Sequence, residues 1–325
     1  MKPLEKHEFD QLREKAAEFL GTATTPAVIS GEALLGIEGL ARCAAGPGRT
    51  FVNLVTGPYG KEFGVWLREC GSKVVDIETP YDEVVTLKAV REALDAVRPD
   101  GLSYVYAEAV TGGANPVKEI QEIAREYGVY TILDAVSSIG ADPFLMDEWG
   151  VDFVSMGLQK ALMGSNGISF LGISERGMQW LRENPVAPRH SLLSTPEVFD
   201  LQQKEIPSYL SVLEVREALR AFEEIEASGG IRALEEKHQK LAVFVRDQVR
   251  EMGYQLYQKR EANCSALNTT VRLPATEAAR QFERAGIVAC GDFDLKGQLL
   301  RINHYGEHCK EEDVKEALEI LRGLL

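Results

Sequence analysis

The chain has 325 residues, of which 45% are hydrophobic and 26% are charged, and its formal net charge at pH 7 is −14. This acidic balance argues against nucleic acid or an anionic membrane as the main partner, and the length is sufficient for two domains. Five dispersed cysteines show no zinc spacing, and neither a secretory signal nor a membrane span is visible in the sequence. We therefore expect a cytoplasmic protein.

Helical and extended segments alternate through the first half of the sequence. Residues 5–20 have apolar side chains at helical spacing, and further helices are expected near 31–45, 58–70, 86–97 and 116–127. Short apolar segments typical of strands occur at 27–30, 50–55, 73–77, 102–107, 129–134, 153–156 and 168–173. This alternation predicts an α/β fold, with a mostly parallel sheet that helices cover on both faces.

A long helical region from 209 to 252 follows, with a break at Gly229-Gly230. His238 lies on its apolar stripe, which predicts a packed core histidine. A smaller α+β unit is expected after this region, with strands near 254–259, 266–274, 287–293 and 298–304 and helices at 276–286 and 310–322. We predict a large domain over 21–225 and a small C-terminal domain over 226–325, against which the helix in residues 1–20 packs.

An aspartate and a lysine follow two of the predicted strands. Asp134 ends the strand at 129–134, and Lys160 comes shortly after the strand at 153–156. Ligands of parallel sheets bind at the carboxyl ends of strands, so we expect the two side chains to share a site. A lysine amine can condense with the aldehyde of a pyridoxal ring, and a carboxylate can keep its pyridine nitrogen protonated. Singly, each residue is more often a surface lysine or a helix cap, but the pair predicts a pyridoxal site.

Further candidates lie at the same predicted edge of the sheet. Ser30 and Gly31 stand at a strand-to-helix junction, where free backbone N–H groups face a bound anion. Tyr59 could stack on a flat heteroaromatic ring, although a tyrosine that merely begins a helix explains the pattern equally well. Val136 could cover the opposite face of the ring.

Two groups near the C-terminus admit more than one interpretation. Arg301 is a charge in an otherwise apolar strand, where it could bind a substrate carboxylate or form a structural ion pair. His304 and His308 have a spacing that could place two imidazoles on one helical face. Gly306 between them favours a turn and no third ligand is evident, so we expect no metal site.

The motifs that contain these residues resemble the class V branch of the fold-type I pyridoxal-dependent aminotransferases. The resemblance runs from about residue 23 to the end. Its markers are Asp134-Ala-Val-Ser-Ser138, Gln159-Lys160, Thr111-Gly112 with Asn115-Pro116, and Arg301-Ile302 with Gly306.

The resemblance implies a role for each candidate. Lys160 would form an aldimine with the ring and relay a proton, Asp134 would pair with the ring nitrogen, and Tyr59 would stack. Arg301 would bind the carboxylate of an amino or keto acid. Gln159 and the Ser30–Gly31 backbone would lie near the phosphate end of the cofactor pyridoxal 5′-phosphate. Members of the family build each active site from two subunits, which implies a homodimer with shared active sites.

Glu32 departs from the pattern of phosphate-binding members, which usually have a small or neutral polar residue there. A carboxylate facing a phosphate costs roughly 4 kcal/mol per pair of unit charges at about 4 Å and an effective dielectric constant near 20. A Glu32 that pointed outward would instead complement the helix N-terminus, and local chemistry leaves both orientations open. The stretches around 30–38, 55–66 and 184–189 resemble the pyridoxamine–pyruvate transaminase branch, in which a glutamate fills the vacant phosphate pocket.

That branch implies transfer of the amine of free pyridoxamine to pyruvate, giving pyridoxal and L-alanine, with the vitamin B6 amine as a covalently bound substrate. A pyridoxal 5′-phosphate-dependent aminotransferase of the alanine–glyoxylate type is the main alternative. A cysteine desulfurase or β-eliminating lyase is another, with Cys290 as the candidate nucleophile, although a buried structural thiol is the simpler interpretation. A non-catalytic vitamin B6-binding protein would need neither an electron sink nor a proton relay.

Overall fold

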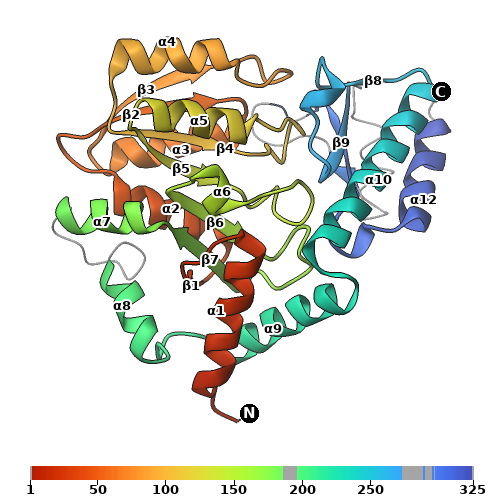
Figure 1. Ribbon diagram of the computed structural model, residues 1–325. Coiled ribbons are helices and arrows are strands. Elements are labelled where there is room, and N and C mark those ends of the chain that lie inside the picture. The colour runs from red at the N-terminus through yellow and green to blue at the C-terminus, as the bar shows by residue number, and fades with distance from the viewer. Residues whose placement is uncertain (1, 186–195, 273–287, 290–294, 296, 324–325) are drawn as a thin grey trace.

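The computed structural model describes residues 2–185, 196–272, 288–289, 295 and 297–323. Within these residues a seven-stranded sheet and a four-stranded sheet lie in two lobes (Figure 1). The larger sheet has the order β1-β7-β6-β5-β4-β2-β3, and β7 alone runs antiparallel to its neighbours. Its strands are β1 (Ala27–Ser30), β2 (Thr50–Val55), β3 (Lys73–Glu78), β4 (Gly101–Val105), β5 (Tyr130–Asp134), β6 (Phe153–Gly157) and β7 (Ile168–Ile173).

Helices cover both faces of this sheet, because successive strand residues point to opposite sides. Phe51 belongs to the hydrophobic cluster on one face and Val52 to the cluster on the other. The first face packs against α2 (Ala33–Ala44), α3 (Pro58–Glu69), α7 (Glu175–Glu183) and α8 (Pro196–Lys204). The second packs against α1 (Lys6–Leu20), α4 (Leu87–Val97), α5 (Val117–Glu126), α6 (Met146–Trp149) and α9 (Val212–Ala227). The predicted mostly parallel, doubly covered sheet is confirmed.

The smaller lobe has its own hydrophobic core. Helices α10 (Gly230–Glu251) and α12 (Glu311–Arg322) pack on an antiparallel sheet of β8 (Gln255–Leu256), β9 (Asn268–Arg272), β10 (Val288–Ala289) and β11 (Leu300–Asn303). Two short 3₁₀ helices, η1 (Glu261–Asn263) and η3 (Gly306–His308), lie between these elements. His238 is fully buried on α10, with its Nδ1 2.9 Å from the Leu234 carbonyl oxygen, so its predicted core position is confirmed. The helix predicted at 276–286 and Cys290 lie outside the described residues.

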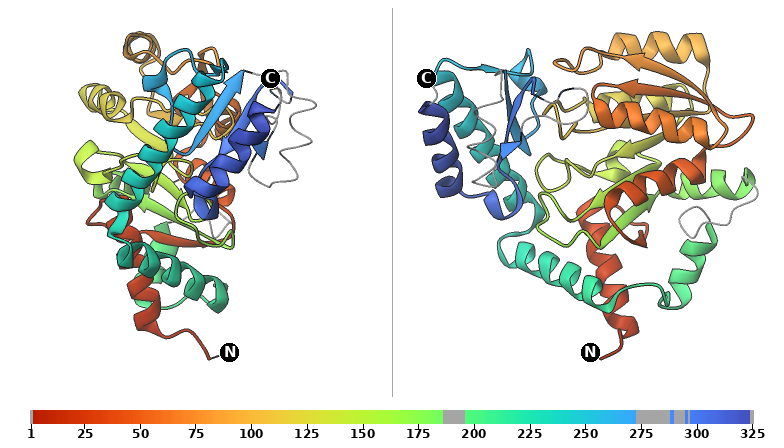
Figure 2. Two further views of the ribbon diagram at one scale, coloured as in Figure 1. Left: turned by 90° about the vertical axis from the view of Figure 1, so that its right-hand side faces the viewer. Right: turned by 180° about the vertical axis from the view of Figure 1, so that it is seen from behind.

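The N-terminal helix packs elsewhere than the sequence predicted. Helix α1 lies against α9 and β7 of the larger lobe (Figure 2), and the rings of Phe19 and Phe222 are 4.6 Å apart. The buried Arg13 donates hydrogen bonds to the carbonyl oxygens of Pro26 (2.9 Å) and Gln202 (2.8 Å). The expectation that residues 1–20 pack against the small domain is therefore wrong, because the apolar stripe of α1 completes the large-domain core. The predicted boundary near residue 225 stays a prediction.

Several elements differ in extent from the sequence prediction. The strand expected at 102–107 ends at Val105, because Ala107 forms an isolated bridge with Ala114 in the following loop. Helices α6, α7 and α8 were not predicted. Among the described helices, none is both long and apolar enough to span a membrane.

Candidate active site

The predicted site residues gather at one edge of the large sheet. Strands β2, β4, β5 and β6 are parallel, so their carboxyl ends meet at this edge, and β1 runs in the same direction. A small cavity of about 100 Å³ opens there. It is lined by Glu32, Ala33, Leu34, Ile37, Tyr59, Asp134, Val136, Ser137, Gln159 and Lys160. The structure thus brings most of the predicted side chains together from segments far apart in the sequence.

Lys160 follows β6 and reaches into this cavity. Its Nζ donates a hydrogen bond of 2.6 Å to Ser137 Oγ and lies 5.7 Å from the centroid of the Tyr59 ring. Desolvation lowers the pKa of Lys160 below its ordinary value because burial disfavours the ammonium; Asp134 opposes this effect and Arg301 adds to it. A lysine with a lowered pKa has a larger share of the neutral amine that attacks an aldehyde.

Asp134 ends β5 and is buried, with 5% of its surface exposed. One carboxylate oxygen accepts a 2.9 Å hydrogen bond from the backbone N–H of Val136. Burial raises the pKa of Asp134 to about 6, although that hydrogen bond and Lys160 act in the opposite direction. The carboxyl group is therefore mostly ionised at neutral pH, the state needed to hold a protonated ring nitrogen.

Glu32 faces the cavity and is also the N-cap residue of α2. One carboxylate oxygen accepts a 2.7 Å hydrogen bond from the Leu34 backbone N–H, and the other accepts one from Gln159 Nε2. Glu32 therefore both caps the N-terminus of α2 and faces the cavity, the two alternatives that the sequence left open. Gln159 Oε1 is buried and has no hydrogen-bond partner among the described residues. A hydrogen-bond donor on a bound molecule could therefore pair with Gln159 Oε1 at this end of the cavity.

Two predicted cofactor-binding residues do not line the cavity. The N–H of Gly31 donates a 2.9 Å hydrogen bond to the Gly167 carbonyl oxygen, so it is not open to an anion. Ser30 ends β1 and is exposed. The Ser30–Gly31 backbone was predicted to face the anion, but the first turn of α2 is occupied by the Glu32 carboxylate instead.

Arg301 approaches the same region from β11 of the small sheet. Its Nη1 donates a 3.0 Å hydrogen bond to the carbonyl oxygen of Ala109, and its charge is close enough to Lys160 to lower the pKa of that amine. Gly306 also reaches the site, since a Cβ there would lie 3.2 Å from the Lys160 carbonyl oxygen. The small lobe therefore lies beside the site, although neither Arg301 nor Gly306 is among the residues that line the cavity.

Sequence reasoning missed two residues of the site. Ser137, which accepts the Lys160 hydrogen bond, lies in the same turn as Asp134 three residues later, and that spacing was the available signal. Glu108 follows β4 and is 1% exposed. It was visible as an acid just after an apolar strand whose carboxyl end belongs to this edge.

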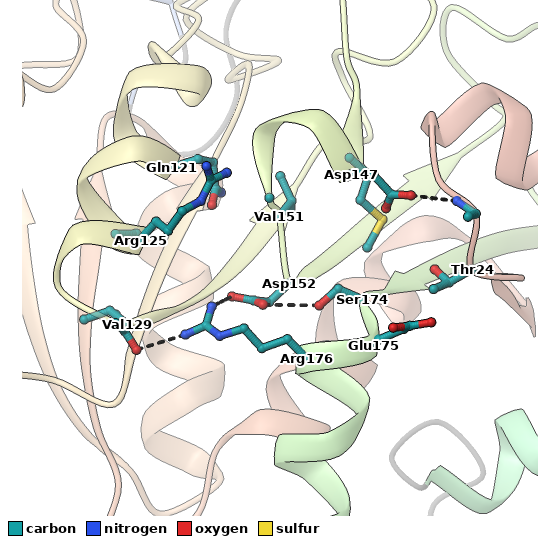
Figure 3. Close-up of a pocket in the computed structure, with 15 residues that line it drawn as sticks. Thr24, Gln121, Arg125, Val129, Asp147, Val151, Asp152, Ser174, Glu175 and Arg176 are labelled. Atoms are coloured by element: carbon teal, nitrogen blue, oxygen red, sulfur yellow. Dashed lines mark hydrogen bonds and ion pairs between the residues drawn. The ribbon is translucent and has the colours of Figure 1, made fainter.

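A larger cavity of about 670 Å³ lies at the opposite edge of the sheet (Figure 3). Its central carboxylate, Asp152, is paired with Arg176 at 2.8 Å and also accepts hydrogen bonds from Ser174 and the backbone N–H of Thr131. Arg176 in turn donates to the Gly128 carbonyl oxygen. These polar groups form hydrogen bonds and an ion pair with one another. We therefore infer that this network stabilises the fold and is not a catalytic site.

No cluster of three or more His, Cys, Asp or Glu side chains that could hold a metal ion occurs in the part of the chain described. His304 is buried and hydrogen-bonds Thr269, whereas His308 lies beside Asp313, so the two imidazoles have separate partners.

The residues around the small cavity fit a pyridoxal ring. An amine for the aldehyde, a carboxylate for the ring nitrogen and an aromatic side chain converge on it, in Lys160, Asp134 and Tyr59. The unpartnered Gln159 oxygen gives a further polar contact for a bound molecule.

Comparison with known proteins agrees with this chemistry. The chain is 30% identical over 327 residues to pyridoxamine–pyruvate transaminase of Mesorhizobium japonicum, covering 98% of this chain and 83% of that protein. It is 26% identical to an alanine–glyoxylate aminotransferase of Drosophila melanogaster, covering 82% of this chain and 71% of the relative.

Solved structures share the fold. The crystal structure of pyridoxamine–pyruvate aminotransferase from Mesorhizobium loti superimposes with a TM-score of 0.90 at 29% identity, covering 98% of this chain and 83% of that one. An alanine–glyoxylate aminotransferase from Nostoc sp. shares the fold with a TM-score of 0.91 at 24% identity, covering 100% and 89%.

The family model described as aminotransferase class-V matches residues 4–287, which is most of the chain. Membership implies dependence on a pyridoxal group, which in this family is pyridoxal phosphate. The protein is an aminotransferase and belongs to the class V aminotransferase family.

Proposed function

We propose that this aminotransferase transfers the amine of free pyridoxamine to pyruvate, giving pyridoxal and L-alanine. The observation that carries the proposal is the Glu32 carboxylate, which occupies the first turn of α2 inside the cavity. A phosphate group would need the same backbone N–H groups and would meet a like charge.

The acceptors at this end of the cavity favour the unphosphorylated vitamin. Glu32 and Gln159 Oε1 are both hydrogen-bond acceptors. The hydroxymethyl group of pyridoxal or pyridoxamine can donate to them, whereas a phosphate dianion has no proton to donate. Gln159 Oε1 is buried, and leaving it unsatisfied beside a phosphate costs about 1–3 kcal/mol, so the hydroxyl is the better complement.

The remaining residues have distinct proposed roles. Asp134 would hold the ring nitrogen protonated, and the ring, when bound, supplies the electron sink for breaking a C–H bond. Lys160 would carry a proton between the carbon of the vitamin and that of the keto acid, with Ser137 keeping its amine in place. Tyr59 and Val136 would contact the ring, and Arg301 would bind the carboxylate of pyruvate.

The alternative is a pyridoxal 5′-phosphate-dependent enzyme of the alanine–glyoxylate type. Its support is the likeness to relatives with that activity. A non-catalytic vitamin-binding protein is disfavoured, because the amine of Lys160 and the carboxylate of Asp134 are both in place.

We also propose a homodimer with shared active sites. Large apolar side chains are exposed beside the cavity, on α2 at Leu34 (42%) and Leu35 (39%). Met163 (43%) and Leu213 (50%) are exposed on segments linked by the contact between Ser165 and Glu214. A second copy that covered these side chains would enclose the site; sedimentation should then show twice the mass of the chain. A cytoplasmic location remains a prediction from the dispersed cysteines.

The test of function is a titration of ligand-free protein with pyridoxal and separately with pyridoxal 5′-phosphate, followed by visible absorbance. Tighter binding of pyridoxal, and formation of L-alanine from pyridoxamine and pyruvate, would support the proposal. Tighter binding of the phosphate would overturn it in favour of the alternative.

A further inference from the structure

Glu108 is a buried carboxyl group beside the cavity to which the proposed reaction gives no role. It accepts hydrogen bonds from the backbone N–H groups of Gly60 (2.7 Å) and Tyr59 (3.3 Å). Both belong to the first turn of α3, whose N–H groups have no partner within the helix. Glu108, in the loop that follows β4, thus caps α3.

The N-terminus of α3 has no side-chain cap from its own N-cap residue. Its N-cap residue, Gly57, has no side chain with which to cap the helix. A Cβ at Gly57 would lie 2.4 Å from Glu108 Cδ, so a larger residue there would displace the carboxyl group. Glycine at position 57 therefore leaves the space that the Glu108 carboxyl group occupies.

The backbone next to Glu108 accepts hydrogen bonds from side chains of the small lobe. The carbonyl oxygen of Ala109 accepts hydrogen bonds from Arg301 Nη1 (3.0 Å) and Asn268 Nδ2 (2.8 Å). The Glu108 carbonyl oxygen accepts from Gly112 N–H (2.8 Å), which closes the loop. One short segment thus contacts both the turn that carries Tyr59 and the strand that carries Arg301.

We propose that Glu108 is a positioning residue that fixes the Tyr59 ring above the bound vitamin ring and keeps the adjoining loop in register with Arg301. This inference rests on the proposed stacking role of Tyr59. In this proposal Glu108 contacts neither the vitamin nor the keto acid. It acts through the backbone of α3 and of the loop that follows β4.

The protonation state of Glu108 suits this role. Burial raises its pKa to about 8, and the groups that face it are Asp134, which adds to the rise, and Lys160, which opposes it. A protonated carboxyl group keeps its carbonyl oxygen as an acceptor for the Gly60 N–H. A glutamine can supply the same acceptor, so Glu108→Gln is the conservative variant.

The experiment compares wild type, Glu108→Gln, Glu108→Ala and the double variant Gly57→Ala/Glu108→Ala. In the double variant the new methyl group at 57 fills part of the space that the carboxyl group leaves, without restoring the cap. Each protein is titrated with pyridoxal and with pyridoxal 5′-phosphate, and the visible circular dichroism of the bound ring is recorded, because that signal depends on the side chains around it.

We expect Glu108→Ala and the double variant to bind the ligand preferred by wild type roughly 10-fold or more weakly, with an altered dichroism band. Glu108→Gln should stay within about 3-fold of wild type and keep the band. Because glutamine also keeps the volume of the side chain, the double variant is the one that separates loss of the cap from loss of packing. Wild-type affinity and dichroism in Glu108→Ala, or full recovery in the double variant, would overturn the inference. A wild-type preference for the phosphate would instead count against the proposed function, while the comparison among variants would still decide the role of Glu108.

Discussion

The sharpest test of the site is the change of Glu32 to Gln, which deletes a charge while keeping the shape of the side chain. We expect this variant to gain affinity for pyridoxal 5′-phosphate relative to pyridoxal. The physical reason is that the wild-type carboxylate lies 2.7 Å from the Leu34 N–H, in the turn where a phosphate would bind.

The size of the effect follows from the position of this carboxylate. A phosphate charge in the same turn would lie on the order of 4 Å from it, which costs about 4 kcal/mol per unit charge at an effective dielectric constant of 20. Glu32 is only partly buried, so solvent screening reduces this cost, and half of it, about 2 kcal/mol, is a reasonable lower bound. The ratio of the two dissociation constants should therefore change by roughly 30-fold to 1000-fold.

The assay is the paired titration by visible absorbance, with Glu38→Gln as the matched control. Glu38 lies on the same helix and pairs with Arg42 at the surface, so its change removes an equal charge away from the cavity. The control should leave the ratio unchanged. A ratio in Glu32→Gln within about 3-fold of wild type would refute the reasoning.

Three further predictions concern Lys160, Arg301 and Glu108. Lys160→Ala should lower transamination by at least about 100-fold and abolish the visible band, while noncovalent binding of the vitamin, followed by calorimetry, persists; substantial remaining turnover would contradict the role of that amine. Arg301→Ala should raise the KM for pyruvate about 10- to 100-fold, with little change in pyridoxal affinity, as steady-state kinetics and the titration would show. Because the pKa of Glu108 is raised from 4.5 to about 8, the folded protein keeps a proton that the unfolded chain releases, so stability falls as pH rises between these values. Urea unfolding should show wild type losing up to about 1.4 kcal/mol per pH unit relative to Glu108→Gln between pH 6 and 8, and parallel curves would exclude this coupling.

Much of the fold was predictable because its signals are local. The strands that end at Asp134 and near Lys160 are short apolar runs between helices, and the structure confirms them as β5 and β6. Their shared edge then follows from parallel pairing alone. The packing of α1 was not predictable in this way, because an apolar stripe indicates that a helix is buried without indicating its partner.

The parts of the site that sequence reasoning missed depend on long-range contacts. Glu108 was not predicted, and it caps a turn 48 residues earlier in the chain. Gln159 was predicted, but its hydrogen bond to Glu32, 127 residues away, was not. A helix cap is usually sought immediately before its helix, where Gly57 has no side chain to offer. The orientation of Glu32 was also not predictable from nearby residues. One of its hydrogen bonds caps its own helix, but the other is to Gln159, far along the chain.

The charges around the cavity support the proposed preference for a vitamin without phosphate. Burial raises the pKa of Glu108 to about 8, so this carboxyl group is mostly neutral at pH 7, and burial also shifts the pKa of Lys160 downward. Glu32, Asp134 and Arg301 are further charged side chains around the site. In the proposed reaction a protonated ring nitrogen would balance Asp134 and a pyruvate carboxylate would balance Arg301. The one charge then left without a ligand partner is the Glu32 carboxylate, hydrogen-bonded to Gln159 and the α2 backbone. A hydroxymethyl group can donate to that carboxylate, whereas a phosphate would add two negative charges beside it. The arrangement proposed to bind the amine and the keto acid would therefore favour pyridoxamine over its phosphate ester.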